Sequence, residues 1–283
     1  MENFNQIGVV GSGAMGNGIA HVSAQSGFET LLIDINQNQL DKALLTIENN
    51  LDRQIKKNII TSNEKKATLL NISTSTNLKD CKDIDLIIEA IPEKYDLKVS
   101  LFKQLDNICK DTTILASNTS SISISNLGDQ TNRPNQIIGM HFMNPVPVMK
   151  LVEVINTIHT SVSTTEKIVD LANKMGKIPV QCNDYPGFVS NRILMPMINE
   201  AIFCLEQNVA TKEAIDKIMK LGMSHPMGPL QLADFIGLDV CLDIMKVLWV
   251  GFNDLKYKPC ALLKKKVSAG LLGKKTGQGF YKY

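Results

Sequence analysis

His141 and Glu153 are the residues whose types and spacing most directly suggest chemistry. His141 ends an apolar run before a proline-rich segment, and Glu153 lies in the next apolar run. If the chain reverses at Pro147, antiparallel pairing joins residues equally distant from it, which makes Glu153 the partner of His141. Cross-strand neighbours lie about 5 Å apart at Cβ, so the carboxylate could orient the imidazole as a general base. The alternative is a histidine packed near a sheet end beside a solvated glutamate.

A glycine-rich turn offers a second kind of chemistry, because Gly11–Gly16 matches the GxGxxG pattern between an apolar strand and a helix. Gly11 permits a tight turn, Gly13 lets the backbone approach a pyrophosphate, and Gly16 lets helix and strand pack closely. Asp34 ends the next strand, where it would bind a ribose and repel a 2′-phosphate, which favours NAD over NADP. The alternatives are a purely structural turn and a solvated carboxylate. The turn is predicted to bind the cofactor through Gly11, Gly13, Ala14, Met15 and Gly16.

A third polar group is the segment 116–121, which follows another apolar run and contains three serines, an asparagine and a threonine. In a doubly wound sheet this position lies at the carboxyl edge, where ligands bind. Its ordinary interpretation is a helix cap, with Ser121 in that role. Asn191 lies just inside the first helix after residue 186, and Arg192 beside it is equally consistent with surface decoration.

These groups need a frame of strands and helices, and the apolar pattern supplies one. Apolar runs at 7–10, 30–33, 84–90, 113–116, 137–140 and 151–155 alternate with helical stretches at about 14–26, 37–57, 63–71, 96–109, 121–127 and 164–175. Strands that are apolar on both faces and separated by helices predict a parallel sheet covered on both sides. Gly27 is expected to end the first helix, with Asn63 and Ser121 as N-caps.

The pattern changes after residue 185, where strand-like runs stop and long helical patterns begin. We expect a Rossmann-type α/β domain over residues 1–185, with a doubly wound, mostly parallel sheet, and an all-helical domain over 186–283. Helices are expected at about 189–205 and 211–221. The stretch 230–249 is apolar on nearly every side, so it forms either the core of this domain or an interface with a partner subunit.

Composition excludes several classes of function. Thirty basic and 28 acidic side chains give a net charge of +2, which predicts no nucleic-acid partner, and no apolar run approaches the ~18 residues of a membrane span. The first six residues lack the features of a secretory signal, which favours a cytoplasmic protein. Six scattered cysteines and four histidines show no metal-ligand spacing, so no metal is expected and the thiols are expected to be buried and reduced.

Together these segments resemble the 3-hydroxyacyl-CoA dehydrogenase family, particularly its bacterial short-chain members, over essentially the whole chain. The likeness rests on the glycine turn with Asp34 and on segments 89–93, 117–121, 141–153, 184–192 and 275–281. It implies NAD-dependent interconversion of (S)-3-hydroxybutyryl-CoA and acetoacetyl-CoA. It also implies a homodimer formed by the helical domain, which closes over the substrate.

The resemblance also implies residue roles. His141 would be the general base, Glu153 its orienting partner, and Ser120 and Asn191 would bind the reacting oxygen. Where members often carry a serine and a lysine for CoA, this chain has Asn50 and Lys57, which share one helix face. The implied NAD contacts are Asp34, Ala90, Glu93, Lys98, Asn118, Ser120 and Lys275, and the implied acyl-CoA contacts are Ser120, Asn144, Asn191, Asn50 and Lys57.

Two other interpretations stay open at this stage. Dehydrogenases of free 3-hydroxyacids also join a Rossmann domain to a helical one, but they use a lysine on the first helix of the second domain. This chain has no lysine between Asp184 and Asn199. A protein that keeps the fold and NAD without catalysis is disfavoured because His141 and Glu153 are both present.

Overall fold

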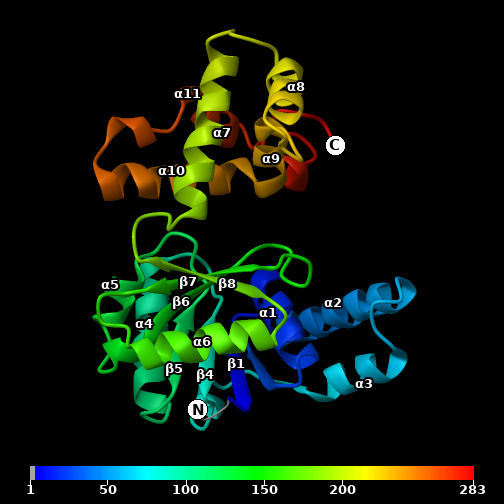
Figure 1. Ribbon diagram of the computed structural model, residues 1–283, viewed down its shortest axis with the longest axis vertical. Coiled ribbons are helices and arrows are strands. Elements are labelled where there is room, and N and C mark those ends of the chain that lie inside the picture. Colours follow the sequence, from blue (N-terminus) through cyan, green and yellow to red (C-terminus); the bar gives the residue numbers. More distant parts are fainter. Residues whose placement is uncertain (1–3) are drawn as a thin grey trace. The chain divides into compact units, whose positions relative to one another are not determined.

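The computed structural model describes residues 4–283, which form two compact units, one ending at Asp184 and the other beginning at Tyr185. The first unit is an α/β structure and the second contains only helices and loops (Figure 1). Each unit has its own cluster of buried apolar side chains. The predicted fold class is therefore confirmed. Residues 1–3, part of the segment used to predict a cytoplasmic location, lie outside the described residues.

The first unit is built on one eight-stranded sheet in the order β3-β2-β1-β4-β5-β6-β7-β8. All neighbours are parallel except the antiparallel pair β6 and β7. The chain order reverses between β1 and β4, which is where doubly wound sheets bind ligands at their carboxyl edge. The strands are β1 Gln6–Val10, β2 Glu29–Ile33, β3 Ile72–Ser75, β4 Leu86–Glu89, β5 Ile114–Ser117, β6 Ile137–Phe142, β7 Leu151–Asn156 and β8 Ile178–Asn183.

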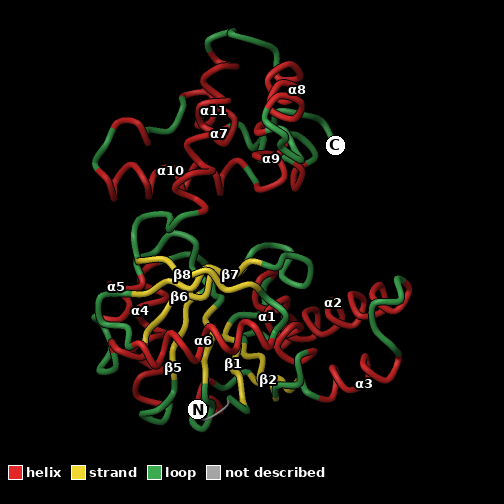
Figure 2. Tube along the Cα trace, in the orientation of Figure 1, coloured by secondary structure: helices red, strands yellow, loops and turns green. Residues whose placement is uncertain are grey.

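Helices cover both faces of this sheet (Figure 2). The main core cluster joins side chains of α1, α2 and α6 to one set of strand residues, including Ile7 and Val9. Phe102 of α4 and Ile124 of α5 are also fully buried. The helices of this unit are α1 Ala14–Gln25, α2 Gln37–Lys56, α3 Ser62–Leu70, α4 Tyr95–Ile108, α5 Ile124–Gly128 and α6 Val162–Lys174.

Two strands were missing from the sequence interpretation, and they are the two edges of the sheet. β3 has the sequence Ile-Ser-Thr-Ser, and β8 is largely exposed and contains Pro179. An edge strand needs less apolar surface than a central strand and tolerates proline where its N–H faces solvent. Apolar runs therefore identify the central strands and miss the edges.

Two predicted helix caps were wrong. Thr61, not Asn63, caps α3, in a reciprocal capping box with Glu64. Ser123, not Ser121, caps α5 by accepting a hydrogen bond from Asn126 N, so this helix begins later than expected. Gly27 follows α1 with φ +91°, which confirms its predicted role after that helix.

The second unit has five α-helices: α7 Ser190–Glu206, α8 Lys212–Gly222, α9 Pro229–Ile236, α10 Leu238–Phe252 and α11 Ala261–Ser268. The apolar stretch 230–249 is not one helix, because Gly237 adopts φ +108° and separates α9 from α10. Much of this stretch forms the core of the unit, as the full burial of Leu230, Leu238 and Leu248 shows.

Candidate functional site

The predicted pairing of His141 with Glu153 is confirmed by the register of β6 and β7, which sets the two residues directly opposite each other. His141 Nδ1 lies 2.7 Å from Glu153 Oε2, and both side chains are buried. Because β7 runs antiparallel to β6, the third residue of β7 lies beside the penultimate residue of β6 at the carboxyl edge of the sheet. A carboxylate at this distance can fix the imidazole's orientation and tautomer.

Ser120 approaches the other imidazole nitrogen. Its Oγ lies 3.0 Å from His141 Nε2, so Ser120, His141 and Glu153 form a continuous polar chain. Ser120 follows β5, which pairs in parallel with β6, and this topology brings the serine segment beside the histidine. The arrangement provides a hydroxyl at the nitrogen that faces away from the carboxylate, which is the geometry for proton transfer with a substrate oxygen.

Glu93 holds the serine segment in place. Its Oε1 accepts hydrogen bonds from Ser120 N at 3.0 Å, from Ser121 N at 3.0 Å and from Thr119 Oγ1. Burial alone would raise the pKa of Glu93, but the Lys98 ammonium and the hydroxyl hydrogen bonds outweigh it and hold that pKa below its usual range. Ser121, predicted as a helix cap, is instead a donor to Glu93 through both its backbone and its hydroxyl.

Lys98 is almost fully buried and links two carboxylates. Its Nζ donates to Glu89 Oε1 at 2.5 Å and to Ile91 O at 3.2 Å, and it lies 3.2 Å from Glu93 Oε2. Burial raises the pKa of Glu89 against the opposing effects of Lys98 and a hydrogen bond from Ser117. Lys98 thus contacts both Glu89 and the carboxylate that binds the serine segment, and its predicted NAD contact stays a prediction.

The glycine turn has the shape that a dinucleotide requires. Gly11 has φ +100°, and a Cβ there would lie 2.6 Å from Ala90 O, while a Cβ on Gly16 would lie 1.7 Å from Gly11 O. In contrast, a Cβ on Gly13 would meet no atom within 4 Å, and no side chain caps α1. Space above the turn and uncapped N–H groups at Ala14 and Met15 fit a pyrophosphate.

Asp34 lies just after β2, as predicted, and its carboxylate also braces the glycine turn. Asp34 Oδ2 accepts hydrogen bonds from Ser12 N at 2.9 Å and Ser12 Oγ at 2.8 Å, and Oδ1 accepts one from Asn36 N. A carboxylate can accept about four hydrogen bonds, so the group retains capacity for a ribose hydroxyl. The residues present therefore fit NAD.

The remaining predicted residues of the first unit lie in three places. Asn118, after β5, accepts a hydrogen bond from Phe142 N at 2.9 Å, while Asn144 is exposed in the loop after β6. Asn50 Oδ1 accepts from Arg53 in α2, and Lys57 ends that helix in an exposed position.

In the second unit, Asn191 is buried near the start of α7. Lys275 Nζ lies 2.6 Å from the carboxylate of Asp239, at the start of α10. Asn191 and Lys275 thus belong to the helical unit, whereas the Ser120, His141 and Glu153 chain belongs to the first.

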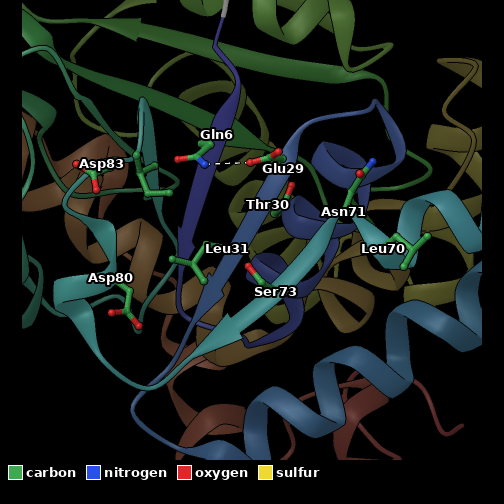
Figure 3. Close-up of a pocket in the computed structure, with 10 residues that line it drawn as sticks. Gln6, Glu29, Thr30, Leu31, Leu70, Asn71, Ser73, Asp80 and Asp83 are labelled. Carbon is green, nitrogen blue, oxygen red and sulfur yellow. Dashed lines mark hydrogen bonds between the residues drawn. The ribbon is translucent and has the colours of Figure 1, made fainter.

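A separate hollow of about 460 Å³ lies at the opposite end of the sheet, around the first residues of β1 and β2 (Figure 3). Gln6 Nε2 donates to Glu29 Oε2 at its edge, and Asp80 and Asp83 add further carboxylates. It contains none of the predicted site residues.

Sequence reasoning assigned no role to Glu89 or Lys177, although both are buried polar residues. Glu89 carried a usable signal, because a charged side chain inside an apolar strand is rarely fully buried without a partner. Lys177, between α6 and β8, carried none, because its partners are backbone carbonyls that no side-chain pattern reveals. Within residues 4–283, no cluster of potential ligands could hold a metal ion, and every helix is too short or too polar to cross a bilayer.

Comparison with known proteins agrees with this geometry along the entire chain. Residues 6–185 match the 3-hydroxyacyl-CoA dehydrogenase NAD binding domain, and residues 187–283 match the C-terminal domain of the same family. The chain is 54% identical over 280 residues to "Probable 3-hydroxybutyryl-CoA dehydrogenase" of Bacillus subtilis, with 99% of this chain and 98% of the relative covered.

A second relative, "3-hydroxybutyryl-CoA dehydrogenase" of Bradyrhizobium diazoefficiens, is 50% identical, with 99% of this chain and 96% of the relative covered. The crystal structure of (S)-3-hydroxybutyryl-CoA dehydrogenase PaaH1 from Ralstonia eutropha superposes with a TM-score of 0.96 at 48% identity and 99% coverage of both chains. With a dinucleotide turn, a histidine at the sheet edge and matches through both units, the chain belongs to the 3-hydroxyacyl-CoA dehydrogenase family and is an NAD-dependent oxidoreductase.

Proposed function

We propose that the enzyme interconverts (S)-3-hydroxybutyryl-CoA and acetoacetyl-CoA, with His141 as the general acid and base. The observation that carries this proposal is the chain from Ser120 Oγ to His141 Nε2, at 3.0 Å, and from His141 Nδ1 to Glu153 Oε2, at 2.7 Å. The choice of substrate is supported by the relatives' names and by 48–56% identity over nearly the full chain.

When bound, NAD supplies the hydride acceptor, or as NADH the hydride donor, for carbon 3 of the substrate. In the oxidation, His141 Nε2 takes the hydroxyl proton, and Glu153 stabilises the imidazolium that forms. In the reduction, the imidazolium returns a proton to the developing alkoxide. Ser120 donates a hydrogen bond to the oxygen on which negative charge grows, and we assign Asn191 the same role.

We assign the cofactor to the first unit's carboxyl edge. There the uncapped start of α1 binds the pyrophosphate, Asp34 binds the adenosine ribose, and Glu93 and Asn118 border the nicotinamide half. Lys98 binds Glu89 and Glu93, and we propose that it acts on the cofactor through those two carboxylates. The first unit's sheet edge thus accounts for the NAD specificity, and we assign Lys275 of the second unit a further NAD contact.

The acyl-CoA thioester is assigned to Asn144 and Ser120 at the reacting end, and to Asn50 and Lys57 at the distal end.

We also propose a homodimer through the helical unit. Several apolar side chains of that unit are more than half exposed, which supports an interface: Val189, Ile193, Ile218, Leu221, Met223, Phe235 and Val250. The cytoplasmic location stays a prediction.

The decisive experiment follows absorbance at the NADH band with acetoacetyl-CoA and, in parallel, with free acetoacetate. We expect turnover with the thioester and none with the free acid. Turnover of the acid at a comparable kcat/KM would instead assign the enzyme to the free 3-hydroxyacid class. The His141→Gln variant is expected to bind NADH while losing about 10²–10⁴-fold in kcat.

A further inference from the structure

The loop 143–150 joins β6 to β7 and therefore begins two residues after His141. Its centre is a single turn in which Pro145 O accepts hydrogen bonds from Val148 N and Met149 N, each at 3.0 Å. One side of the loop is open, since Asn144 and Met149 are exposed and Val148 is 71% exposed. The position of the loop must therefore be set by contacts on its other side.

Lys177 provides those contacts from the connection between α6 and β8. Its Nζ donates to Val146 O at 2.5 Å and to Met149 O at 2.8 Å, and the side chain is buried. The next residue, Ile178, donates its backbone N–H to Lys150 O at 2.8 Å. Three carbonyls of the loop are thus held by two consecutive residues.

A buried lysine whose hydrogen-bond partners are carbonyls alone is unusual in proteins. Among the residues described, no carboxylate forms an ion pair with Lys177, and burial lowers its pKa. Burying an ammonium without an anion costs free energy that an apolar residue would avoid, so mere filling of space does not explain a lysine here. The lysine is explained by the hydrogen bonds that its ammonium donates to two carbonyls, Val146 O and Met149 O, which would otherwise be unpaired.

The same loop also contacts the cofactor-binding helix. Val146 is almost fully buried against α1 at Gly18, where a Cβ would lie 2.9 Å from Val146 Cβ. His21, one turn further along α1, is fully buried, and its pKa falls to about 4 through burial and, to a smaller extent, the charge of Lys177. The loop is therefore clamped between the Lys177 ammonium and a notch in α1.

We propose that Lys177 is a positioning residue that fixes the loop 143–150 between α1 and β8, and so fixes the substrate-binding end of the site relative to His141 and the cofactor turn. This inference rests on the proposed function, because Asn144 and His141 acquire their roles there. A loosened loop would shift Asn144 away from the substrate while leaving the glycine turn and Asp34 intact.

The test is Lys177→Met, with Lys177→Arg as the conservative variant and Ile114→Ala as the control. Ile114 is buried at the opposite end of the sheet, so its truncation destabilises the same unit without touching the loop. For Lys177→Met we expect kcat/KM for acetoacetyl-CoA to fall by about tenfold to 10²-fold, the range that follows from an ångström-scale misplacement. The NADH dissociation constant, measured by NADH fluorescence, should stay within about twofold of the wild-type value.

Hydrogen–deuterium exchange supplies a readout that does not depend on activity. Exchange at Val148 and Met149 should accelerate in Lys177→Met and return toward the wild-type rate in Lys177→Arg, which keeps the cation and its donors. If Lys177→Met does not fold, Gly18→Ala tests the opposite side of the clamp and should lower kcat/KM with the same unchanged NADH affinity.

A loss in Lys177→Met no larger than in Ile114→Ala, or unchanged exchange in the loop, would overturn the proposal. Failure of the proposed function is a separate result, because it would appear as a wild-type enzyme that does not reduce acetoacetyl-CoA. The exchange measurement would still decide the role of Lys177 in that case.

Discussion

The imidazole of His141 is bound at both nitrogens, by Glu153 at Nδ1 and by Ser120 at Nε2. In the proposed mechanism the two contacts have different roles. The carboxylate would stabilise the protonated ring and fix its tautomer, whereas the serine would bind the substrate oxygen. Substitutions at these two residues should therefore give different kinetic phenotypes.

Glu153→Gln is expected to lower kcat by as much as about 10⁴-fold, because an amide neither stabilises the imidazolium nor enforces the same tautomer. The pH dependence of kcat should change as well. Glu29→Gln, at the exposed start of β2, is the matched control and should behave as wild type. An unchanged rate and pH profile in Glu153→Gln would show that the pair has no catalytic role.

Asp34 is predicted to set the choice of cofactor, because a 2′-phosphate would have to be placed beside its carboxylate. We expect the wild type to prefer NADH strongly over NADPH, measured as the ratio of kcat/KM values. Asp34→Ser combined with Ile35→Arg should narrow that ratio. Ile35 is suited to the change because it is 97% exposed, whereas Asn36 caps α2.

The melting temperature must be measured alongside this pair of substitutions, since Asp34 also binds Ser12. Equal use of NADH and NADPH by the wild type would contradict the assignment of Asp34.

Arg133 binds the C-terminal end of helix α4. Its guanidinium is buried and binds the end of α4, with Nε on Asp106 Oδ1 at 2.7 Å and Nη2 on Asp106 O at 2.8 Å. Nη1 binds Lys110 O at 2.6 Å beyond the helix. Asp106 O is among the last four carbonyls of α4, which have no partner within the helix.

We predict that Arg133→Met destabilises the protein by about 3–5 kcal/mol, because the Asp106 carboxylate, whose side chain is 5% exposed, would lose its cation and keep only the hydrogen bonds from Asn132. Urea unfolding at neutral pH measures this loss. Lys110→Met is the control, since its ion pair with Asp85 is partly exposed to solvent and is expected to contribute under about 1 kcal/mol.

The same pair also predicts a pH effect. Burial would raise the pKa of Asp106, but hydrogen bonds from Asn132 and Arg133 outweigh it and lower that pKa in the folded protein. A lowered pKa means that this stabilisation is complete above the ordinary value of about 3.9 and is lost as pH falls through the folded value. Wild type should therefore lose stability more steeply than Arg133→Met below about pH 4.

Elements could be predicted from sequence where apolar periodicity is strong, and the six central strands and long helices were found in this way. The pairing of His141 with Glu153 was also accessible, because a short reversal fixes its register. What escaped prediction depends on partners distant in the chain. The carbonyls bound by Arg133 and Lys177 become visible only after the chain has folded.

At the scale of the whole molecule, the C-terminal tail is an integral part of the second unit. Phe280 is buried, and Asp234 accepts hydrogen bonds from the backbone N–H groups of Phe280 and Tyr281, each at 2.8 Å. Deleting residues 274–283 would therefore disrupt the helical unit itself. A single substitution at Lys275 is a better test of the tail's proposed contact with NAD.

Trp249, the only tryptophan in the chain, lies in α10 and reports on the second unit alone. If Lys275 contacts NAD, then NAD⁺ at about 100 times its Kd should raise the midpoint temperature of the unfolding transition that Trp249 reports. The corresponding gain in the free energy of unfolding has an upper limit of about 2.7 kcal/mol. Thermal unfolding followed by tryptophan fluorescence measures this shift. Lys275→Met should reduce it and Lys282→Met, in the same tail, should not. Equal shifts in both variants would remove Lys275 from the cofactor site.

The antiparallel pair β6 and β7 has a consequence for recombination between related genes. Residues 137–156 form one contiguous segment that carries His141, Asn144 and Glu153, so an exchange of about twenty codons transfers all three together. The two sides of the clamp, Gly18 and Lys177, lie outside that segment and would come from the recipient. Chimaeras should thus inherit the proposed acid–base pair readily, while their activity would depend on whether the recipient provides a matching glycine and lysine.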